Sequence, residues 1–103
     1  MLIDARELPD DHVIESDICI VGAGAAGISL ALALDGTPWS VSLLESGGFV
    51  YDDAVQSLYD GQAEGDLLEP GQRYLSRSRW RYFGGATNNW TGLCVPLATT
   101  DFE

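Results

Sequence analysis

The strongest constraint on the fold is a glycine-rich stretch that follows an apolar run and opens an alanine-rich one. The run Asp17 to Val21 (DICIV) is short and β-branched, which predicts a strand buried on both faces. Alanine and leucine dominate from about Gly24 to Leu34, and Gly36 follows, which predicts a helix with a glycine near its C-cap. Ser40 to Leu44 (SVSLL) predicts a second strand of the same type. Together these segments predict a β-α-β unit with parallel strands and a right-handed crossover.

The glycines between the first strand and the helix form the sequence GAGAAG, which is the GxGxxG pattern in the context that a dinucleotide-binding loop requires. The first glycine permits a tight turn, the second lets a pyrophosphate approach the backbone, and the third lets helix and sheet pack closely. The helix N-terminus then offers N–H groups and partial positive charge to the phosphates. The predicted phosphate-binding residues are Gly22, Ala23, Gly24, Ala25, Ala26 and Gly27. The alternative is a tight turn without a ligand.

An acid follows the second strand at the position where such loops contact a ribose. Glu45 stands 23 residues after Gly22, where a carboxylate accepts hydrogen bonds from a ribose 2′-hydroxyl and repels a 2′-phosphate. The pattern therefore disfavours NADP, unless Glu45 is only a solvated strand end. Because the ADP half is common to FAD and NAD, the loop alone leaves the cofactor open.

The charge of the chain excludes several classes of partner. A formal net charge of −11, with no lysine, argues against binding to DNA, RNA or anionic lipid. Four of the five arginines fall between Arg73 and Arg81. We interpret Arg73 and Arg77 as solvated, and Arg81 as a support for phosphate or for an acidic segment.

The remaining sequence predicts a soluble chain with short irregular elements. Residues 1–16 are acidic, carry no secretory signal, and are expected to form an exposed lead-in. The uncharged run from Ile18 to Leu34 is short for a membrane span and is broken by glycines. Cys19 and Cys94 fit no disulfide framework, so we expect them to be reduced and structural, in a cytoplasmic protein.

After the second strand the pattern changes. Asp53 to Tyr59 predicts a short helix ended by Gly61, and residues 60–72 predict a polar, turn-rich connection. From Tyr74 to Glu103 no clean period is present, and irregular backbone of this composition commonly lines a ligand.

Two further motifs accompany the glycine loop. Glu45-Ser46-Gly47-Gly48 follows the second strand directly, and a longer block runs from Arg81 to Gly92 (RYFGGATNNWTG), followed by Pro96-Leu97 and Asp101-Phe102. Together they resemble the glucose-methanol-choline (GMC) family of FAD-dependent oxidoreductases. The resemblance extends from about Asp17 to Glu103, and the combination of motifs is far more specific than the glycine loop alone.

The resemblance implies an α/β fold, in which residues 17–103 would be the N-terminal part of a Rossmann-like FAD-binding domain. In the family the Gly-Gly block runs beside the flavin, where small residues let backbone N–H groups approach the ring and the pyrophosphate. The cofactor-binding residues that this implies, beyond the glycine loop and Glu45, are Ser46, Arg81, Gly84, Gly85, Thr87, Asn88, Asn89, Trp90 and Thr91. The alternatives are that Asn88 and Asn89 are turn residues, and that Trp80 and Trp90 are core aromatics.

The block departs from the commonest family pattern at Trp80 and at Asn89-Trp90. It looks closer to the sugar-oxidising branch, including pyranose oxidases, in which His-Trp occurs at the second of these points. The histidine that pyranose oxidases use for a covalent flavin bond falls on Asn89, so the FAD implied here is non-covalent. Thr91 matches a position beside the reactive edge of the flavin.

The family oxidises a sugar or other alcohol by hydride transfer to flavin, with a histidine base near the C-terminus of a much longer chain. The one histidine here is His12, in the lead-in, and the sequence has no other evident catalytic or metal-ligand cluster. We therefore expect a truncated domain that supplies the cofactor half, with no catalytic residue and no metal site. Alone, it should bind FAD weakly or not at all and show no turnover. An NAD-dependent Rossmann oxidoreductase and a non-catalytic nucleotide-binding fragment remain as alternatives, and the electron acceptor is open.

Overall fold

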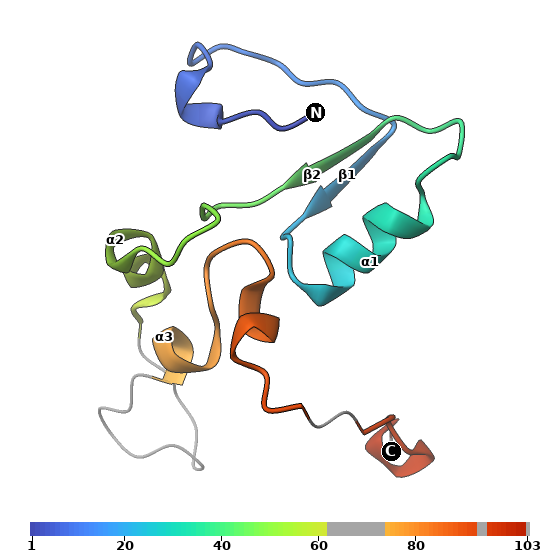
Figure 1. The fold of residues 1–103 in the computed structure, drawn as a ribbon, viewed down its shortest axis with the longest axis vertical. Coiled ribbons are helices and arrows are strands. Elements are labelled where there is room, and N and C mark those ends of the chain that lie inside the picture. The colour runs from blue at the N-terminus through green and yellow to red at the C-terminus, as the bar shows by residue number, and fades with distance from the viewer. Residues whose placement is uncertain (62–73, 93–94, 103) are drawn as a thin grey trace.

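The computed structural model describes residues 1–61, 74–92 and 95–102 of the 103-residue chain. Its elements are short and are joined by irregular segments (Figure 1). With η denoting 3-10 helices, they are η1 Ala5–Glu7, β1 Ile18–Val21, α1 Ala25–Ala33, β2 Val41–Leu44, α2 Asp53–Gln56, η2 Ser57–Tyr59, α3 Tyr74–Ser78, η3 Gly85–Asn89 and η4 Thr99–Phe102.

The first half of the chain is a small mixed α/β unit. β1 and β2 pair in parallel, from Ile18 opposite Val41 to Val21 opposite Leu44, and α1 connects them and lies against both (Figure 1). The predicted strand–helix–strand order and parallel pairing are therefore confirmed. The helix also ends as expected, because Gly36, just beyond it, takes the left-handed conformation with φ +75°.

Side chains fix the register where the two strands begin. One carboxylate oxygen of Asp17, Oδ2, accepts hydrogen bonds from the N–H (2.8 Å) and the hydroxyl (2.6 Å) of Ser40. The N–H of Asp17 donates in turn to Ser40 Oγ (2.9 Å). The two bonds that the carboxylate accepts, first from the hydroxyl and then from the N–H of Ser40, lower the pKa of the Asp17 carboxyl.

Within the described residues the sheet is covered on one face, by α1, so the prediction of strands buried on both faces is wrong for β1. Ile20 is buried and faces α1, since a Cβ placed at Gly27 would lie 3.4 Å from Ile20 Cγ2. Val21 is 82% exposed, and Cys19 is an exposed free thiol instead of a core residue. Alternation along a strand places these two side chains on the face opposite α1. Cys94 lies outside the described residues.

The core is small and lies where β1 turns into α1. Among the residues that the structure describes, Ile20 and Ala23 are the buried hydrophobic residues and Gln56 is the buried polar one. The radius of gyration is 16.9 Å, against roughly 13 Å for a compact chain of this length. No helix in the described ranges is long and apolar enough to cross a membrane.

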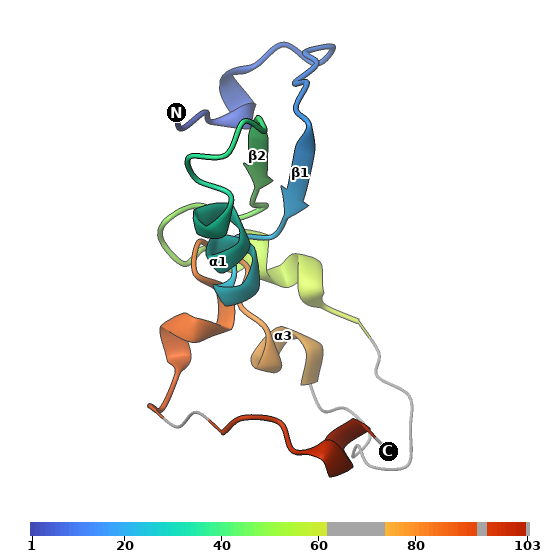
Figure 2. The ribbon, with the colours of Figure 1, turned by 90° about the vertical axis from the view of Figure 1, so that its right-hand side faces the viewer.

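The second half of the chain folds back toward the sheet through short helical turns (Figure 2). The helix predicted over residues 53–59 is present as α2 followed by η2, and Asp52 caps it by accepting hydrogen bonds from Ala54 and Val55. Residues 62–72 of the predicted polar connection lie outside the described ranges. The segment after them, predicted to be irregular, contains α3, η3 and η4, each of five residues or fewer.

Candidate functional site

Three glycine-containing segments that are distant in sequence meet at the C-terminal ends of the two strands. They are the glycine loop (22–27), the segment after β2 (45–48) and the block that begins at Arg81. The glycine loop joins β2 where Gly22 N–H donates to Leu44 C=O (2.7 Å). The block that begins at Arg81 joins the loop where Gly84 N–H donates to Ala23 C=O (2.7 Å), and Gly24 and Gly84 form a parallel β-bridge. Accordingly, η3 lies beside α1 in both views (Figures 1 and 2).

The third glycine of the loop, Gly27, stands where there is no room for a side chain. A Cβ at Gly27 would overlap the carbonyl oxygen of Gly22 and lie 3.2 Å from its carbonyl carbon. This glycine therefore permits the close helix–strand packing that the sequence predicts for it. Gly22 itself has φ +99°, which suits the tight turn expected of the first glycine.

The segment Glu45-Ser46-Gly47-Gly48 packs against the block in the same way. A Cβ at Gly47 would overlap the carbonyl oxygen of Arg81 and lie 2.6 Å from its carbonyl carbon. One residue on, Gly48 C=O accepts a hydrogen bond from Phe83 N–H (2.9 Å). The two segments are thus held in direct backbone contact.

The N-terminus of α1 is open. Its N-cap is Gly24, which has no side chain to accept from the first-turn N–H groups, and Ala25 and Ala26 are exposed. A Cβ at Gly24 would meet nothing within 4 Å, although the backbone there (φ −81°, ψ −174°) suits any residue. Folding of the described chain therefore gives no reason for a glycine at this position. A ligand that needs close approach to the backbone gives one.

The Glu45 carboxylate ties the glycine loop to the end of β2. Its Oε2 accepts from Ala23 N–H (2.8 Å), and its Oε1 accepts from the N–H groups of Ser46 (2.9 Å) and Gly47 (3.0 Å). Partial burial alone would raise the pKa of Glu45, but these backbone donors outweigh it and lower the pKa below its ordinary value. Sequence reasoning missed this bracing role, because the donor from Ala23 comes from a distant segment.

Glu45 retains capacity to bind a ligand. An ionised carboxylate oxygen accepts about two hydrogen bonds. Within the described ranges Oε2 accepts one, from Ala23 N–H. One lone pair of Oε2 thus remains available to accept from a hydroxyl group beside the glycine loop.

The Gly-Gly block is built around two left-handed glycines, Gly84 (φ +90°) and Gly85 (φ +55°). Thr87 Oγ1 donates to Gly84 C=O, and Asn88 Nδ2 donates to the carbonyls of Phe83 (2.8 Å) and Gly85 (3.1 Å). These two side chains hold the turn itself, which is the turn role left open for Asn88. Asn89, Trp90 and Thr91 lie at and after the end of η3 and are exposed. Trp90, 59% exposed, meets the turn through its N–H, which donates to Thr87 C=O (3.3 Å).

Of the four arginines that the structure describes, Arg81 is the one placed beside the site. Its Nη1 donates to Ser46 Oγ (3.1 Å), and its guanidinium lies 4.3 Å from the centre of the Tyr59 ring. Its Nε is buried and has no hydrogen-bond partner within the described part of the chain. Arg77 is exposed, in agreement with a solvated role, and Arg73 lies outside the described ranges.

One buried polar residue at the edge of the site was not predicted. Gln56 is 5% exposed, and its three side-chain hydrogen bonds to described residues go to main-chain atoms of the segment that leads into the block. A single glutamine in a short helix carries no sequence signal of such a role, because its partners are 20 or more residues away.

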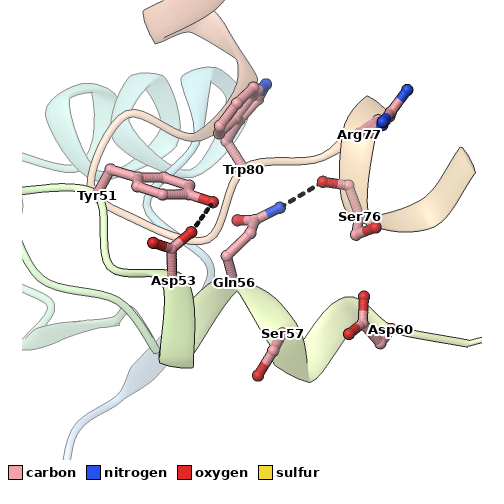
Figure 3. A pocket seen from close by; sticks show the side chains of 8 residues that line it. All are labelled: Tyr51, Asp53, Gln56, Ser57, Asp60, Ser76, Arg77 and Trp80. Carbon is pink, nitrogen blue, oxygen red and sulfur yellow. Dashed lines mark hydrogen bonds between the residues drawn. The ribbon is translucent and has the colours of Figure 1, made fainter. Parts of the chain in front are cut away.

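A pocket lies beside Gln56 (Figure 3). Its walls come from the α2–η2 turn, α3 and Trp80, and Tyr51 donates from its hydroxyl to Asp53 (3.0 Å) at one side. Trp80 packs edge-on against Tyr51, with ring centres 5.4 Å apart, so its role here is that of a packed aromatic. The cofactor-binding residues predicted from the sequence do not line this pocket.

Comparison of the chain with protein-family models, with curated proteins and with solved structures gave no match. The site itself is a two-stranded parallel α/β unit in which a glycine loop, an acid and a second glycine block converge at the strand ends.

Proposed function

We propose that this chain binds the ADP half of FAD, without a covalent bond, as the cofactor-binding part of an oxidoreductase that oxidises the CH–OH group of a sugar or other alcohol. The observation that carries the proposal is the unexplained glycine at the open N-terminus of α1, with Glu45 on one side and Gly84-Gly85 on the other.

The phosphates are assigned to the first turn of α1. Gly24, Ala25 and Ala26 present N–H groups at the positive end of the helix, and no side chain at the N-cap competes for them. The chain as a whole carries a charge of −11, so an anion is bound here by local N–H groups and not by a basic surface.

The ribose is assigned to Glu45. Its free lone pair suits a hydroxyl, and its lowered pKa keeps it ionised at neutral pH, so that a 2′-phosphate would be repelled. This supports FAD or NAD over NADP.

The second glycine block supports FAD over NAD. The glycine loop and the acid serve both cofactors, but the Gly84-Gly85 pair lies directly on the loop, where the resemblance to GMC oxidoreductases places the segment beside the flavin. Bound FAD would supply the hydride acceptor. Asn89, at the position of the histidine that pyranose oxidases link to flavin, supports non-covalent binding.

The proposal is tested by replacing Gly24 with alanine. The new methyl group has space in the unliganded chain but occupies the position assigned to the pyrophosphate. Gly48→Ala is the matched control, because its Cβ would also be free, with the nearest atom 4.0 Å away. Both variants should keep or slightly raise the free energy of unfolding, by about 0.5 kcal/mol, since alanine restricts the unfolded chain.

Titrations with ADP, FAD, NAD and NADP are followed through the backbone amide signals of the 103-residue chain. We expect weak binding of ADP, in the millimolar range, with the largest shifts at Gly24, Ala25 and Ala26 and weaker binding of NADP than of NAD. Gly24→Ala should lose at least tenfold in affinity while Gly48→Ala does not. Shifts located elsewhere, or equal affinities of wild type and Gly24→Ala, would refute the site.

The redox assignment is tested on the product of the whole reading frame that encodes this chain. The purified protein should show flavin absorbance, release FAD into the supernatant on acid precipitation, and be bleached by a sugar or alcohol without oxygen. Flavin retained in the precipitate would refute non-covalent binding. A colourless protein that reduces NAD would support the NAD alternative, and one that binds ADP without redox activity would support the non-catalytic one.

A further inference from the structure

Gln56 makes an unusual set of contacts for a residue in a four-residue helix. Its Nε2 donates to the carbonyls of Ser76 (2.8 Å) and Arg79 (2.7 Å), and its Oε1 accepts from Arg81 N–H (3.0 Å). Figure 3 shows the amide directed from α2 toward the α3 segment. Both N–H donors of the amide are therefore used, and the side chain is 5% exposed.

The chain clamped by Gln56 runs directly into the proposed nucleotide site. Beyond the Arg81 N–H that Gln56 binds, the Arg81 carbonyl packs against Gly47. Phe83 N–H then donates to Gly48 C=O, and Gly84 N–H donates to Ala23 C=O. Gln56 is thus the outermost of a continuous series of main-chain anchors that ends at the glycine loop.

We infer that Gln56 is a positioning residue for the dinucleotide site: its amide fixes the path of residues 79–81 and so holds Gly84 against the glycine loop. The inference rests on the proposed function for its consequence on nucleotide binding, but its structural part can be tested without any ligand.

The clamp is not the sole support of the fold. The same segment also packs through Phe49 on Phe83, with ring centres 5.2 Å apart, and through Tyr51 on Trp80 and Tyr82, at 5.4 and 6.2 Å. None of the hydrogen bonds that the structure describes for Gln56 goes to the β1–α1–β2 unit. Loss of the amide should therefore loosen the block locally and leave the β-α-β unit intact.

The experiment compares Gln56→Ala with the wild-type chain by amide hydrogen exchange. Protection of the Phe83 and Gly84 amides should fall about tenfold, the effect of losing roughly one net hydrogen bond with buried groups left unpaired. The amides of Gly22 and Ile28, which bond within the β-α-β unit, should change by less than about twofold. Ser57→Ala is the control, because its hydroxyl donates to Ala54 C=O within the same turn (2.7 Å) and not to the segment that Gln56 clamps, as far as the described residues go.

A second variant separates positioning from packing. Gln56→Glu keeps the size of the side chain but, when ionised, turns a carboxylate toward the carbonyls of Ser76 and Arg79. When protonated it again has one donor. The hydrogen-exchange protection of the Gly84 amide in Gln56→Glu, divided by the wild-type protection at the same pH, should therefore recover as the pH falls. The division removes pH effects that are common to both chains, including any from the charged residues Asp53, Asp60 and Arg77 that line the pocket beside Gln56.

The outcomes are distinct. An equal loss of protection at all four amides would show Gln56 to be a general structural residue, and an unchanged Gly84 amide would refute the clamp; either overturns the inference. If Gly84 loosens and ADP affinity falls with it, the positioning role holds. If Gly84 loosens but the wild-type chain shows no ADP binding, the clamp stands and the proposed function fails.

Discussion

Replacing Gly47 with alanine tests the packing that brings the acid-bearing segment and the Gly-Gly block together. The new Cβ would overlap Arg81 C=O and lie 2.6 Å from its carbonyl carbon and 2.7 Å from Tyr82 Cα, all backbone atoms that no rotamer change can move. Normal carbon–oxygen contacts are about 3.3 Å or more, so the two segments must separate by about 1 Å.

The cost follows from two effects. Overpacking a close contact costs about 1–3 kcal/mol. Separation also weakens the bonds from Phe83 to Gly48 and from Gly84 to Ala23, each worth about 1 kcal/mol. We expect Gly47→Ala to lower the free energy of unfolding by about 2–4 kcal/mol.

The control lies one residue away. Gly48 has neither a positive φ nor a close neighbour, so Gly48→Ala should be neutral or slightly stabilising. Urea unfolding of both variants, followed by circular dichroism and by tryptophan fluorescence, measures the difference. If the Gly47→Ala midpoint matched that of Gly48→Ala, the close packing described here would be wrong.

Two further changes probe the loop and its acid. Gly27→Ala should cost at least about 2 kcal/mol in urea unfolding, because the Cβ overlaps the Gly22 carbonyl; a midpoint equal to the wild type would contradict this contact. Glu45→Gln should cost about 2 kcal/mol at pH 7, since charged acceptors of backbone hydrogen bonds are lost. The folded-state pKa of Glu45 is lowered, so its stabilisation is complete above the ordinary pKa of 4.5 and is lost as pH falls through the folded value. The difference in free energy of unfolding between wild type and Glu45→Gln should therefore shrink at pH 3. Asp17 titrates in both proteins and so does not change this difference, and a difference that stayed constant would refute the role of Glu45.

The parts of the fold that local pattern determines were predictable. β1, α1 and β2 lie within one residue of their expected bounds, because apolar runs and a glycine stop specify them without help from distant residues. The turn at Gly22 and the close packing at Gly27 follow equally from chemistry that the motif itself contains.

What depends on distant partners was not predictable. The sequence shows that β1 is apolar, but not that Val21 would be 82% exposed, because coverage of a sheet face is decided by other elements. The bracing by Glu45 and the clamp by Gln56 both use main-chain donors or acceptors, which are present at every residue and so carry no sequence signal. Asn88, for which the sequence left both a flavin contact and a turn role open, bonds the carbonyls of its own turn.

The difference in free space at Gly24 and Gly27 has a consequence for how the two positions would respond to selection. A screen of single substitutions scored for abundance or protease resistance should reject nearly every change at Gly27, where folding itself excludes a side chain. The same screen should accept alanine or serine at Gly24, since the unliganded chain has room for them. A screen scored for cofactor occupancy should reject both. If tolerance of substitution differed between the two screens at Gly24 but not at Gly27, genetic data alone would locate the cofactor contact at Gly24.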